Sequence, residues 1–214
     1  MCAISGAPTI QKAFDLYEAG LQRGHYSSGA LIVTKQNSFV LKQKEPFTYD
    51  GIIDSIISKD NIPDVLYCAF HSRAPTNVVE EEWNYNTTHP FVYETYHVAH
   101  NGIINNFKDF KESSEFTVDS SIIPYHLFTY KGNLSHTYEK YTGLLTSWVY
   151  ESSEQNFFLI KAGSSLHKDK DSFSSVPFEG SQQIEKDGLI FKFTERKELE
   201  QISDFTYSNP YFIL

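Results

Sequence analysis

Cysteine is scarce in this sequence, with two residues among 214, at positions 2 and 68. Two cysteines are too few for a disulfide framework, and such usage is typical of a reducing compartment. Cys68 lies in the apolar run Val65 to Phe70, where a small buried strand residue is a far better interpretation than a catalytic thiol. Cys2 is therefore the cysteine left to carry chemistry.

Long apolar runs and basic clusters are absent as well. No apolar segment approaches the roughly 20 residues that span a bilayer, and no basic region followed by an apolar stretch opens the chain. The formal net charge is −9, and no block of Lys and Arg is present to bind phosphates. We therefore expect a cytoplasmic protein that binds neither membrane nor nucleic acid.

Motifs for metals and nucleotides are also missing. The eight histidines form no His/Cys or His/Glu pair at the spacing of a zinc or iron site. No Gly-rich phosphate loop followed by Lys-Ser or Lys-Thr is present. The sequence thus predicts no metal and no cofactor, and we interpret His71, His97 and His100 as packing groups or as groups that support a site.

The composition predicts a folded α+β protein. Apolar residues make up 40% of the chain and aromatic residues 15%, which is typical of globular proteins. The length suits one domain, and many strand candidates with two or three helices between them indicate α+β layering. Helical periodicity appears over 10–21, after a capping Thr9, and again over 52–57. The strand candidates are 2–5, 30–34, 38–42, 65–71, 96–100, 146–150, 157–161, 173–178 and 189–193.

Two local signals refine this pattern. Because Asn-Gly is a strong turn signal, we expect the strand that begins at Tyr96 to end at Asn101-Gly102, where the chain turns sharply. Asp119 or Ser120 can cap a helix that continues through Leu127.

Position 2 suggests a nucleophile. A small side chain there normally permits removal of the initiator methionine, which would leave Cys2 with a free α-amine beside its thiol. The reference pKa is about 7.7 to 8.0 for the amine and about 8.5 for the thiol. The amine can therefore act as the base for its own side chain.

An amide hydrolase of this kind also needs donors for an oxyanion and charges that bind the substrate. Asn101 and Gly102 combine a side-chain amide with a backbone N–H, although an ordinary turn also explains them. Arg73 follows a buried strand and could bind a carboxylate in two places, or be a surface arginine. Asp119 could bind an ammonium group, or simply cap a helix.

Five segments carry a resemblance through their order and spacing. They are 1–6 (Met-Cys-Ala-Ile-Ser-Gly), 23–29 (Arg-Gly-His-Tyr-Ser-Ser-Gly), 71–76 (His-Ser-Arg-Ala-Pro-Thr), 100–106 (His-Asn-Gly-Ile-Ile-Asn-Asn) and 119–123 (Asp-Ser-Ser-Ile-Ile). Together they resemble the class II glutamine amidotransferases, whose nucleophile is N-terminal, and most closely the glutaminase domain of glucosamine-6-phosphate synthase. The resemblance covers roughly residues 2–195.

The resemblance implies roles for individual residues. Cys2 would be nucleophile and amine base, with Asn101 and the Gly102 amide as oxyanion donors. Glutamine's α-carboxylate would meet Arg73, and its α-ammonium group would meet Asp119.

Supporting positions follow from the same likeness. Thr76, with Gly102, would make further contacts to glutamine, and Arg23 and Tyr26 match a loop around the cysteine and substrate. His89-Pro90 matches a family feature whose role does not follow from the residues. Two departures stand beside these matches. Ala74 and Pro75 replace the Trp-Ala or Tyr-Ser pair of close relatives, and Val118 replaces a threonine.

The resemblance further implies an αββα sandwich of the N-terminal nucleophile hydrolase type. Residues 1–214 would form a single type-2 glutamine amidotransferase domain with no synthase domain attached. The ammonia released from glutamine would then pass to a synthase or ligase on a separate chain.

Two other functions remain open on the sequence. The same nucleophile could cleave γ-glutamyl amides or peptides, although Arg73 with Asp119 favours a free amino acid. Alternatively, the chain could be a catalytically silent module that binds glutamine for regulation, since a blocked amine cannot act as a base.

The presence or absence of Met1 distinguishes an active enzyme from a catalytically silent module. We expect the purified protein to lack the methionine, because position 2 carries a small side chain, and intact-mass spectrometry measures this directly. A protein that retains the full mass would favour the silent binding module.

Overall fold

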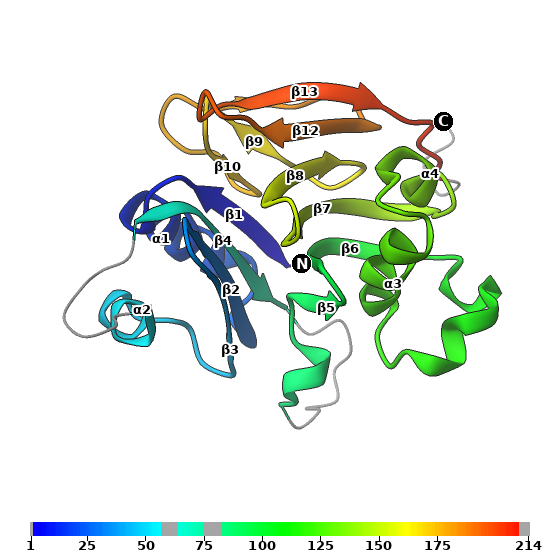
Figure 1. Cartoon of the computed structure of the whole chain (residues 1–214), viewed down its shortest axis with the longest axis horizontal. Coiled ribbons are helices and arrows are strands. Elements are labelled where there is room, and N and C mark those ends of the chain that lie inside the picture. Colours follow the sequence, from blue (N-terminus) through cyan, green and yellow to red (C-terminus); the bar gives the residue numbers. More distant parts are fainter. Residues whose placement is uncertain (1, 57–63, 75–82, 210–214) are drawn as a thin grey trace.

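Two antiparallel sheets face each other in the computed structural model, which describes residues 2–56, 64–74 and 83–209 (Figure 1). Within this part of the chain, one sheet has the strand order β11-β9-β10-β1-β4-β2-β3. Its strands are β1 (Ala3–Ala7), β2 (Ser27–Thr34), β3 (Ser38–Gln43), β4 (Val65–Arg73), β9 (His167–Lys168), β10 (Phe173–Ser174) and β11 (Gln182–Gln183). We call this the first sheet.

The second sheet has the order β13-β12-β8-β7-β6-β5 over the same described ranges. Its strands are β5 (Phe91–Tyr93), β6 (Tyr96–Ile104), β7 (Gly143–Glu151), β8 (Asn156–Lys161), β12 (Leu189–Phe193) and β13 (Leu199–Asp204). Every strand pair in both sheets is antiparallel.

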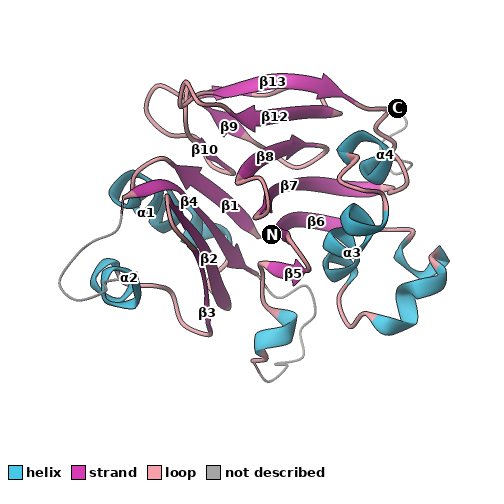
Figure 2. Ribbon diagram, viewed as in Figure 1, coloured by secondary structure: helices cyan, strands magenta, loops and turns pink. Residues whose placement is uncertain are grey.

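Helices cover the outer face of each sheet (Figure 2). The first sheet carries α1 (Ile10–Gly20) and α2 (Tyr49–Ile56), and the second carries α3 (Ile122–Thr129) and α4 (Leu134–Tyr138). Short 3₁₀ turns include η2 (Tyr85–Thr87) and η5 (Asp119–Ser121). The result is the predicted αββα sandwich.

Strand alternation produces the layers. On β2, Leu31 and Val33 pack into the core between the sheets, whereas Ala30 and Ile32 pack under the helices. On β6, Ala99 faces the other sheet and Val98 faces α3. Because side chains alternate along a strand, each sheet buries both faces.

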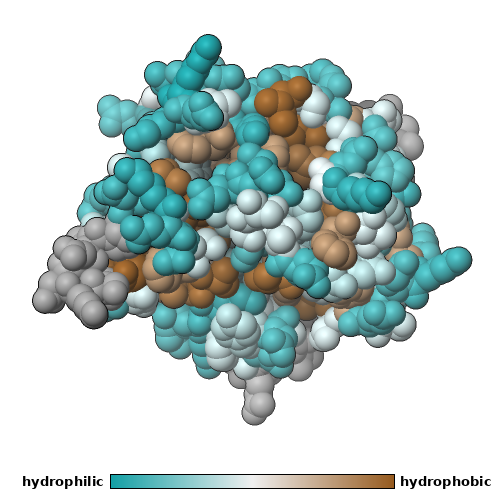
Figure 3. Space-filling model, in the orientation of Figure 1, coloured by the Kyte–Doolittle hydropathy of each residue, from teal (hydrophilic) through white to brown (hydrophobic). Residues whose placement is uncertain are grey.

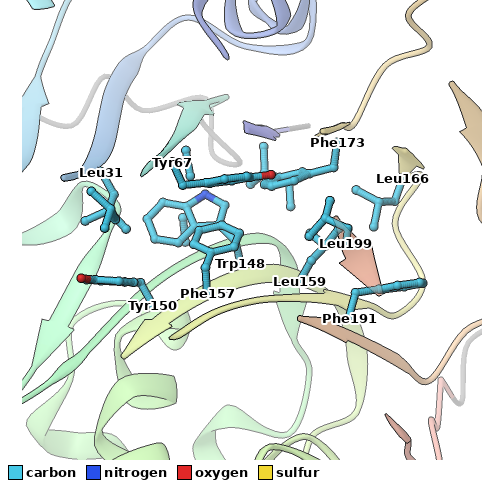
Figure 4. Close-up of a cluster of buried hydrophobic side chains, with 14 of the residues drawn as sticks. Leu31, Tyr67, Trp148, Tyr150, Phe157, Leu159, Leu166, Phe173, Phe191 and Leu199 are labelled. Carbon is cyan, nitrogen blue, oxygen red and sulfur yellow. The ribbon is translucent and has the colours of Figure 1, made fainter. Parts of the chain in front are cut away.

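Trp148 lies at the centre of the core between the sheets (Figure 4). Its side chain is fully buried, and its indole N–H donates to the Phe70 carbonyl across the gap at 3.2 Å. Tyr67 and Phe157 pack nearby, with ring centroids 4.5 Å apart. This indole bond links the two sheets directly.

The start of α1 matches its sequence signal. The Thr9 hydroxyl accepts from the Lys12 backbone N–H at 3.3 Å, as an N-cap does. One face of the helix buries Phe14 and Tyr17 against the first sheet. The predicted helix over 10–21 is therefore confirmed, as is the burial of Cys68 in β4.

The prediction of a turn at Asn101-Gly102 is wrong. Both residues lie inside β6, where Asn101 pairs with Thr146 and Gly102 with Leu145 of β7. A Cβ on Gly102 would lie 1.8 Å from the Leu144 carbonyl oxygen. The glycine therefore permits close approach of two strands, and its sequence signal looks the same as that of a turn.

Other helix and strand boundaries also differ from the predicted ones. The helix expected through Leu127 is present as α3, but neither Asp119 nor Ser120 is its N-cap. Both belong to η5, and the Asp119 carboxylate accepts from Ile104 and Ser120. The strand expected over 173–178 is paired only at Phe173–Ser174. β13 and α4 were not predicted, because their polar and exposed residues hide the apolar periodicity.

The face drawn in Figure 3 is largely hydrophilic, with separate apolar patches. Most large apolar side chains of the described residues are more than half buried. A few are close to half exposed, among them Ile103 at 49% and Ile202 at 49%. None of the described helices is long and apolar enough to cross a bilayer.

Burial predicts how two large-to-small substitutions differ. Leu159→Ala empties space in the fully buried core between the sheets, and we expect a loss of about 2 to 5 kcal/mol in the free energy of unfolding. Ile202→Ala, at a half-exposed position on β13, should cost less than about 1 kcal/mol. Urea denaturation of both variants measures this difference, and equal losses would contradict the assignment of the core.

Candidate active site

Cys2 lies directly before β1, and β1 begins at the edge where the two sheets meet (Figure 1). Ala3 pairs with Ser72 of β4, so the register places Cys2 beside Arg73. Arg73 in turn pairs with Ser27 of β2. The Cys2 thiol is half-buried, with its sulfur 3.9 Å from the Ala74 carbonyl oxygen.

Burial and nearby groups act on this thiol in opposite directions. Burial raises the pKa of Cys2 most, the hydrogen bond to the Ala74 carbonyl and the Arg73 guanidinium lower this pKa, and the Asp119 carboxylate raises it. Because burial favours the neutral thiol, a nucleophilic attack by Cys2 requires a base within reach.

Contacts with Tyr26 and Thr87 hold Arg73 in place. The Tyr26 N–H donates to the Arg73 carbonyl at 2.8 Å, and the Tyr26 ring lies 5.5 Å from the guanidinium carbon. The Arg73 Nη1 also donates to the Thr87 carbonyl at 3.4 Å. Tyr26 thus contacts Arg73 through both backbone and ring, and such a stack orients the planar cation.

Asp119 is fixed by two backbone donors. Its Oδ2 accepts from the Ile104 N–H at 2.7 Å, and its Oδ1 accepts from the Ser120 N–H at 2.8 Å. A carboxylate offers about four acceptor positions. Acceptor capacity therefore remains for a further donor such as an ammonium group.

Asn101 shares the inward face of β6 with Ala99, since the two are separated by one strand period. It is 1% exposed, and its side-chain amide donates to the Ser175 hydroxyl at 3.1 Å. The second hydrogen of that amide is available to another acceptor. Asn101 is thereby a rigid donor that faces the first sheet.

The Gly102 N–H lies at the edge of β6 away from β7. Asn105 donates to Thr142 across the β6–β7 ladder, and bonded residues alternate in an antiparallel pair. The amides of Gly102 and Ile104 therefore point to the opposite edge, where Ile104 meets Asp119. On that edge β5 pairs with β6 only as far as Val98.

His100 supports this edge from the outer face. Its Nε2 lies 2.7 Å from the Leu144 carbonyl and its Nδ1 lies 2.8 Å from the Ser120 hydroxyl. Because a carbonyl only accepts, Nε2 carries the proton. Burial lowers the pKa of His100, although Asp119 raises it, so at neutral pH Nδ1 accepts from Ser120.

Arg23 lies behind Cys2. Its Nε donates to the Cys2 carbonyl at 3.2 Å, and its Nη1 donates to the Ser165 hydroxyl at 3.0 Å and the Ser175 carbonyl at 3.2 Å. These bonds join the start of the chain to the segment after β8, which holds Ser165, and to the segment after β10, which holds Ser175. A direct contact between Arg23 and a substrate stays a prediction.

The structure therefore gathers Cys2, Arg23, Tyr26, Arg73, Asn101, Gly102 and Asp119 around one edge of the sandwich. Thr76 lies outside the described residues. Ser175 and Ser165, which the sequence did not single out, belong to the same network. No local motif marks them, because only tertiary packing brings residues 165 and 175 to Arg23 and Asn101.

In the described ranges, no group of three or more His, Cys, Asp or Glu is placed to hold a metal ion.

A hollow of about 840 Å³ lies at the ends of the strands opposite to Cys2, lined by Val33, Tyr67, Phe157 and Phe193 among others. Cys2 and its neighbours do not line it. The chemistry and this hollow are thus separate features.

Comparison with known proteins gives matches in structure alone. No family model matches the sequence, and no curated protein matches it. The structure matches glutamine phosphoribosylpyrophosphate amidotransferase from B. subtilis, complexed with ADP and GMP, with a TM-score of 0.70 and 12% identity. A structure described as the allosteric regulatory enzyme of purine biosynthesis matches with the same TM-score and identity.

Each match covers 96% of this chain and 49% of the other. This chain therefore spans about half the length of those chains. At 12% identity the likeness shows the fold, which is an αββα sandwich. The roles of the individual residues are not decided by it.

His71, two residues before Arg73 on β4, packs against His89, and both histidines are buried. The rings of His71 and His89 lie 3.9 Å apart, and burial lowers the pKa of His71 to about 3 and that of His89 well below 6.5. Both rings stay neutral in the folded protein. Unfolding allows them to take up protons below about pH 6.5.

These histidines therefore stabilise the fold above about pH 6.5, and that stability is lost as the pH falls toward their folded pKa values. We expect His89→Phe, which keeps an aromatic ring beside His71, to reduce the loss of unfolding free energy between pH 6 and 4 by up to about 1.4 kcal/mol per pH unit. Urea titrations at several pH values measure the slope, with His25→Gln at an exposed position as the control. An unchanged slope in His89→Phe would contradict the assignment.

Proposed function

We propose that this protein hydrolyses the side-chain amide of glutamine, with Cys2 as the nucleophile after removal of Met1. The observation that carries the proposal is the register of β1 and β4, which sets Cys2 beside Arg73, while the Asp119 carboxylate, bonded to Ile104 of β6, acts on the same thiol. A free amino acid carries an α-carboxylate and an α-ammonium group, the complements of Arg73 and Asp119. The site thus supports a zwitterionic substrate.

The first step forms a thioester. The α-amine of Cys2 takes the thiol proton, and the sulfur attacks the carboxamide carbon of glutamine. The negative charge that develops on the carboxamide oxygen is stabilised by the Asn101 side chain and the Gly102 N–H. Collapse of this intermediate breaks the C–N bond, and the protonated amine returns its proton to the departing ammonia.

The second step restores the enzyme. Water attacks the thioester carbon and the Cys2 amine accepts a proton from that water. The C–S bond then breaks to release glutamate, and the amine returns its proton to the sulfur. Each proton moves between the substrate or water and a single residue. Burial of the thiol supports this scheme, because a neutral thiol and a neutral amine are the starting pair that the amine-base mechanism needs.

The contacts of Arg73 and Asp119 support a defined orientation of the bound substrate. Arg73 is stacked on Tyr26, so its planar fork can meet a carboxylate in two places. Asp119 keeps an acceptor position next to the edge of β6 where the Gly102 N–H lies. Arg23, bonded to the Cys2 carbonyl, would hold the nucleophile in place, with any contact to glutamine secondary.

The fate of the ammonia is a separate part of the proposal. We infer that the ammonia passes to an acceptor enzyme, a synthase or ligase, that docks over Cys2 and its neighbours. Such docking would keep ammonia from being protonated in water before it reacts.

An N-terminal cysteine hydrolase of γ-glutamyl peptides is the second candidate. The same nucleophile and oxyanion donors serve that reaction, and it also uses a free α-carboxylate and α-ammonium group. The two activities differ in the leaving group, which is ammonia for glutamine and an amine for the peptide.

Cysteine substitutions test the proposed nucleophile. Cys2→Ala should reduce ammonia release from glutamine by at least about a thousandfold, because no other group can form the thioester. Cys68→Ala is the matched control, since it removes the other cysteine from a buried strand position apart from the charged pair. It should lower stability and leave turnover intact.

The measurement is a coupled assay for ammonia and glutamate, run on protein shown to lack Met1. Glutamine and a γ-glutamyl peptide are compared as substrates. Undiminished hydrolysis by Cys2→Ala would exclude the mechanism, and a preference for the peptide would favour the second candidate.

A further inference from the structure

Ser175 joins the two sheets at the candidate site. Its hydroxyl accepts from the Ile4 N–H at 3.0 Å and from the Asn101 side-chain amide at 3.1 Å. Ile4 belongs to the strand that follows Cys2, whereas Asn101 belongs to β6 in the second sheet. One oxygen atom therefore connects the strand of the proposed nucleophile with the proposed oxyanion donor.

The backbone of Ser175 is bonded to the same strand. Its N–H donates to the Ile4 carbonyl at 2.9 Å, and its carbonyl accepts from Arg23 Nη1 at 3.2 Å. Arg23 in turn donates to the Cys2 carbonyl. Ser175 is thus linked to Cys2 through two routes, one by way of Ile4 and one by way of Arg23.

A second serine contacts Asn101 from the other side. The Ser164 hydroxyl donates to the Asn101 backbone carbonyl at 2.8 Å. That bond holds the main chain, while Ser175 is bonded to the side chain. The orientation of the Asn101 amide therefore depends on Ser175.

We propose that Ser175 is a positioning residue that holds Asn101 and Cys2 at the correct separation for glutamine hydrolysis, an inference that rests on the proposed function. Ser175 is 1% exposed, and it acts on the reaction through Asn101. An oxyanion donor works only within about 2.7 to 3.1 Å of the charged oxygen. Nucleophile and donor come from different sheets, so a bond between the sheets at this point sets that distance.

The hydroxyl is suited to this task by its two lone pairs. Two N–H groups donate to it, and each would lose its partner in an alanine variant. The Asn101 amide would then be free to rotate away from the direction that the oxyanion needs. The loss should appear in kcat, because glutamine binding by Arg73 and Asp119 does not depend on this amide.

Ser174 provides a matched control. It is also fully buried, but its hydroxyl accepts a local bond from the Val176 N–H at 3.1 Å. Ser174 and Ser175 are neighbours in sequence. A serine-to-alanine change at each therefore removes the same atom from equally buried positions.

The test measures kcat and KM for glutamine in protein that lacks Met1. We expect Ser175→Ala to lower kcat about 10- to 100-fold, less than the 100- to 1,000-fold expected on loss of a whole oxyanion donor, with KM changed less than about threefold. Ser174→Ala should retain kcat. In an Asn101→Ala background, Ser175→Ala should lower kcat clearly less, because the residue it positions is absent.

Ser175→Cys keeps the size of the side chain and offers only a weak acceptor. It should show the same loss of kcat, and it replaces Ser175→Ala if that variant does not fold. Equal losses with and without Asn101, or a kcat within twofold of wild type, would overturn the positioning role alone. Failure of the wild type and Ser174→Ala to release ammonia would overturn the proposed function, and this inference with it.

Discussion

The hydrogen bonds between the two sheets at the start of β1 are the interaction on which the candidate site depends. Cys2 precedes a strand of the first sheet, and Asn101 lies in the second. The Ser175 hydroxyl and the Arg23 guanidinium connect them. The ring of His71 in β4, whose Nε2 lies 3.2 Å from the His100 carbonyl of β6, adds another bond between the sheets beside the site. The stiffness of the sandwich itself comes from its core, where Trp148 spans the sheets at 3.2 Å from the Phe70 carbonyl.

Electrostatics completes the arrangement. Arg73 and Asp119 act on the Cys2 thiol with opposite sign, so neither charge alone decides its protonation. Burial does, and it favours the neutral thiol. A neutral thiol is a poor nucleophile until a base removes its proton. In the proposed mechanism, the amine exposed by loss of Met1 meets that need on the same residue, and Arg73 and Asp119 would bind the α-carboxylate and α-ammonium group of glutamine.

Much of the fold could be predicted from the sequence because its main strands and α1 have clear apolar periodicity. Thr9 marked the start of α1 correctly, and the buried strand through Cys68 was identified. Asn101-Gly102 misled, since a glycine that allows close strand approach has the same local signature as one that allows a turn. β13 was missed because its side chains are mostly exposed and polar.

The residues of the candidate site also differ in whether the sequence alone could predict them. Residues in motifs, such as Cys2, Arg73 and Asp119, could be proposed from spacing and resemblance. Ser175 could not, because its partners Ile4 and Asn101 are distant in sequence and only the packing of the sheets brings them together. Thr76 lies outside the described residues and stays a prediction.

Covalent labelling tests the central claim most directly. A glutamine analogue with a chloroketone in place of the carboxamide would be incubated with protein that lacks Met1, and the adduct mapped by peptide mass spectrometry. The account predicts one adduct per chain, on Cys2, suppressed by excess glutamine, with Cys68 unlabelled. Labelling that glutamine does not suppress, or that occurs on Cys68 and not on Cys2, would contradict it.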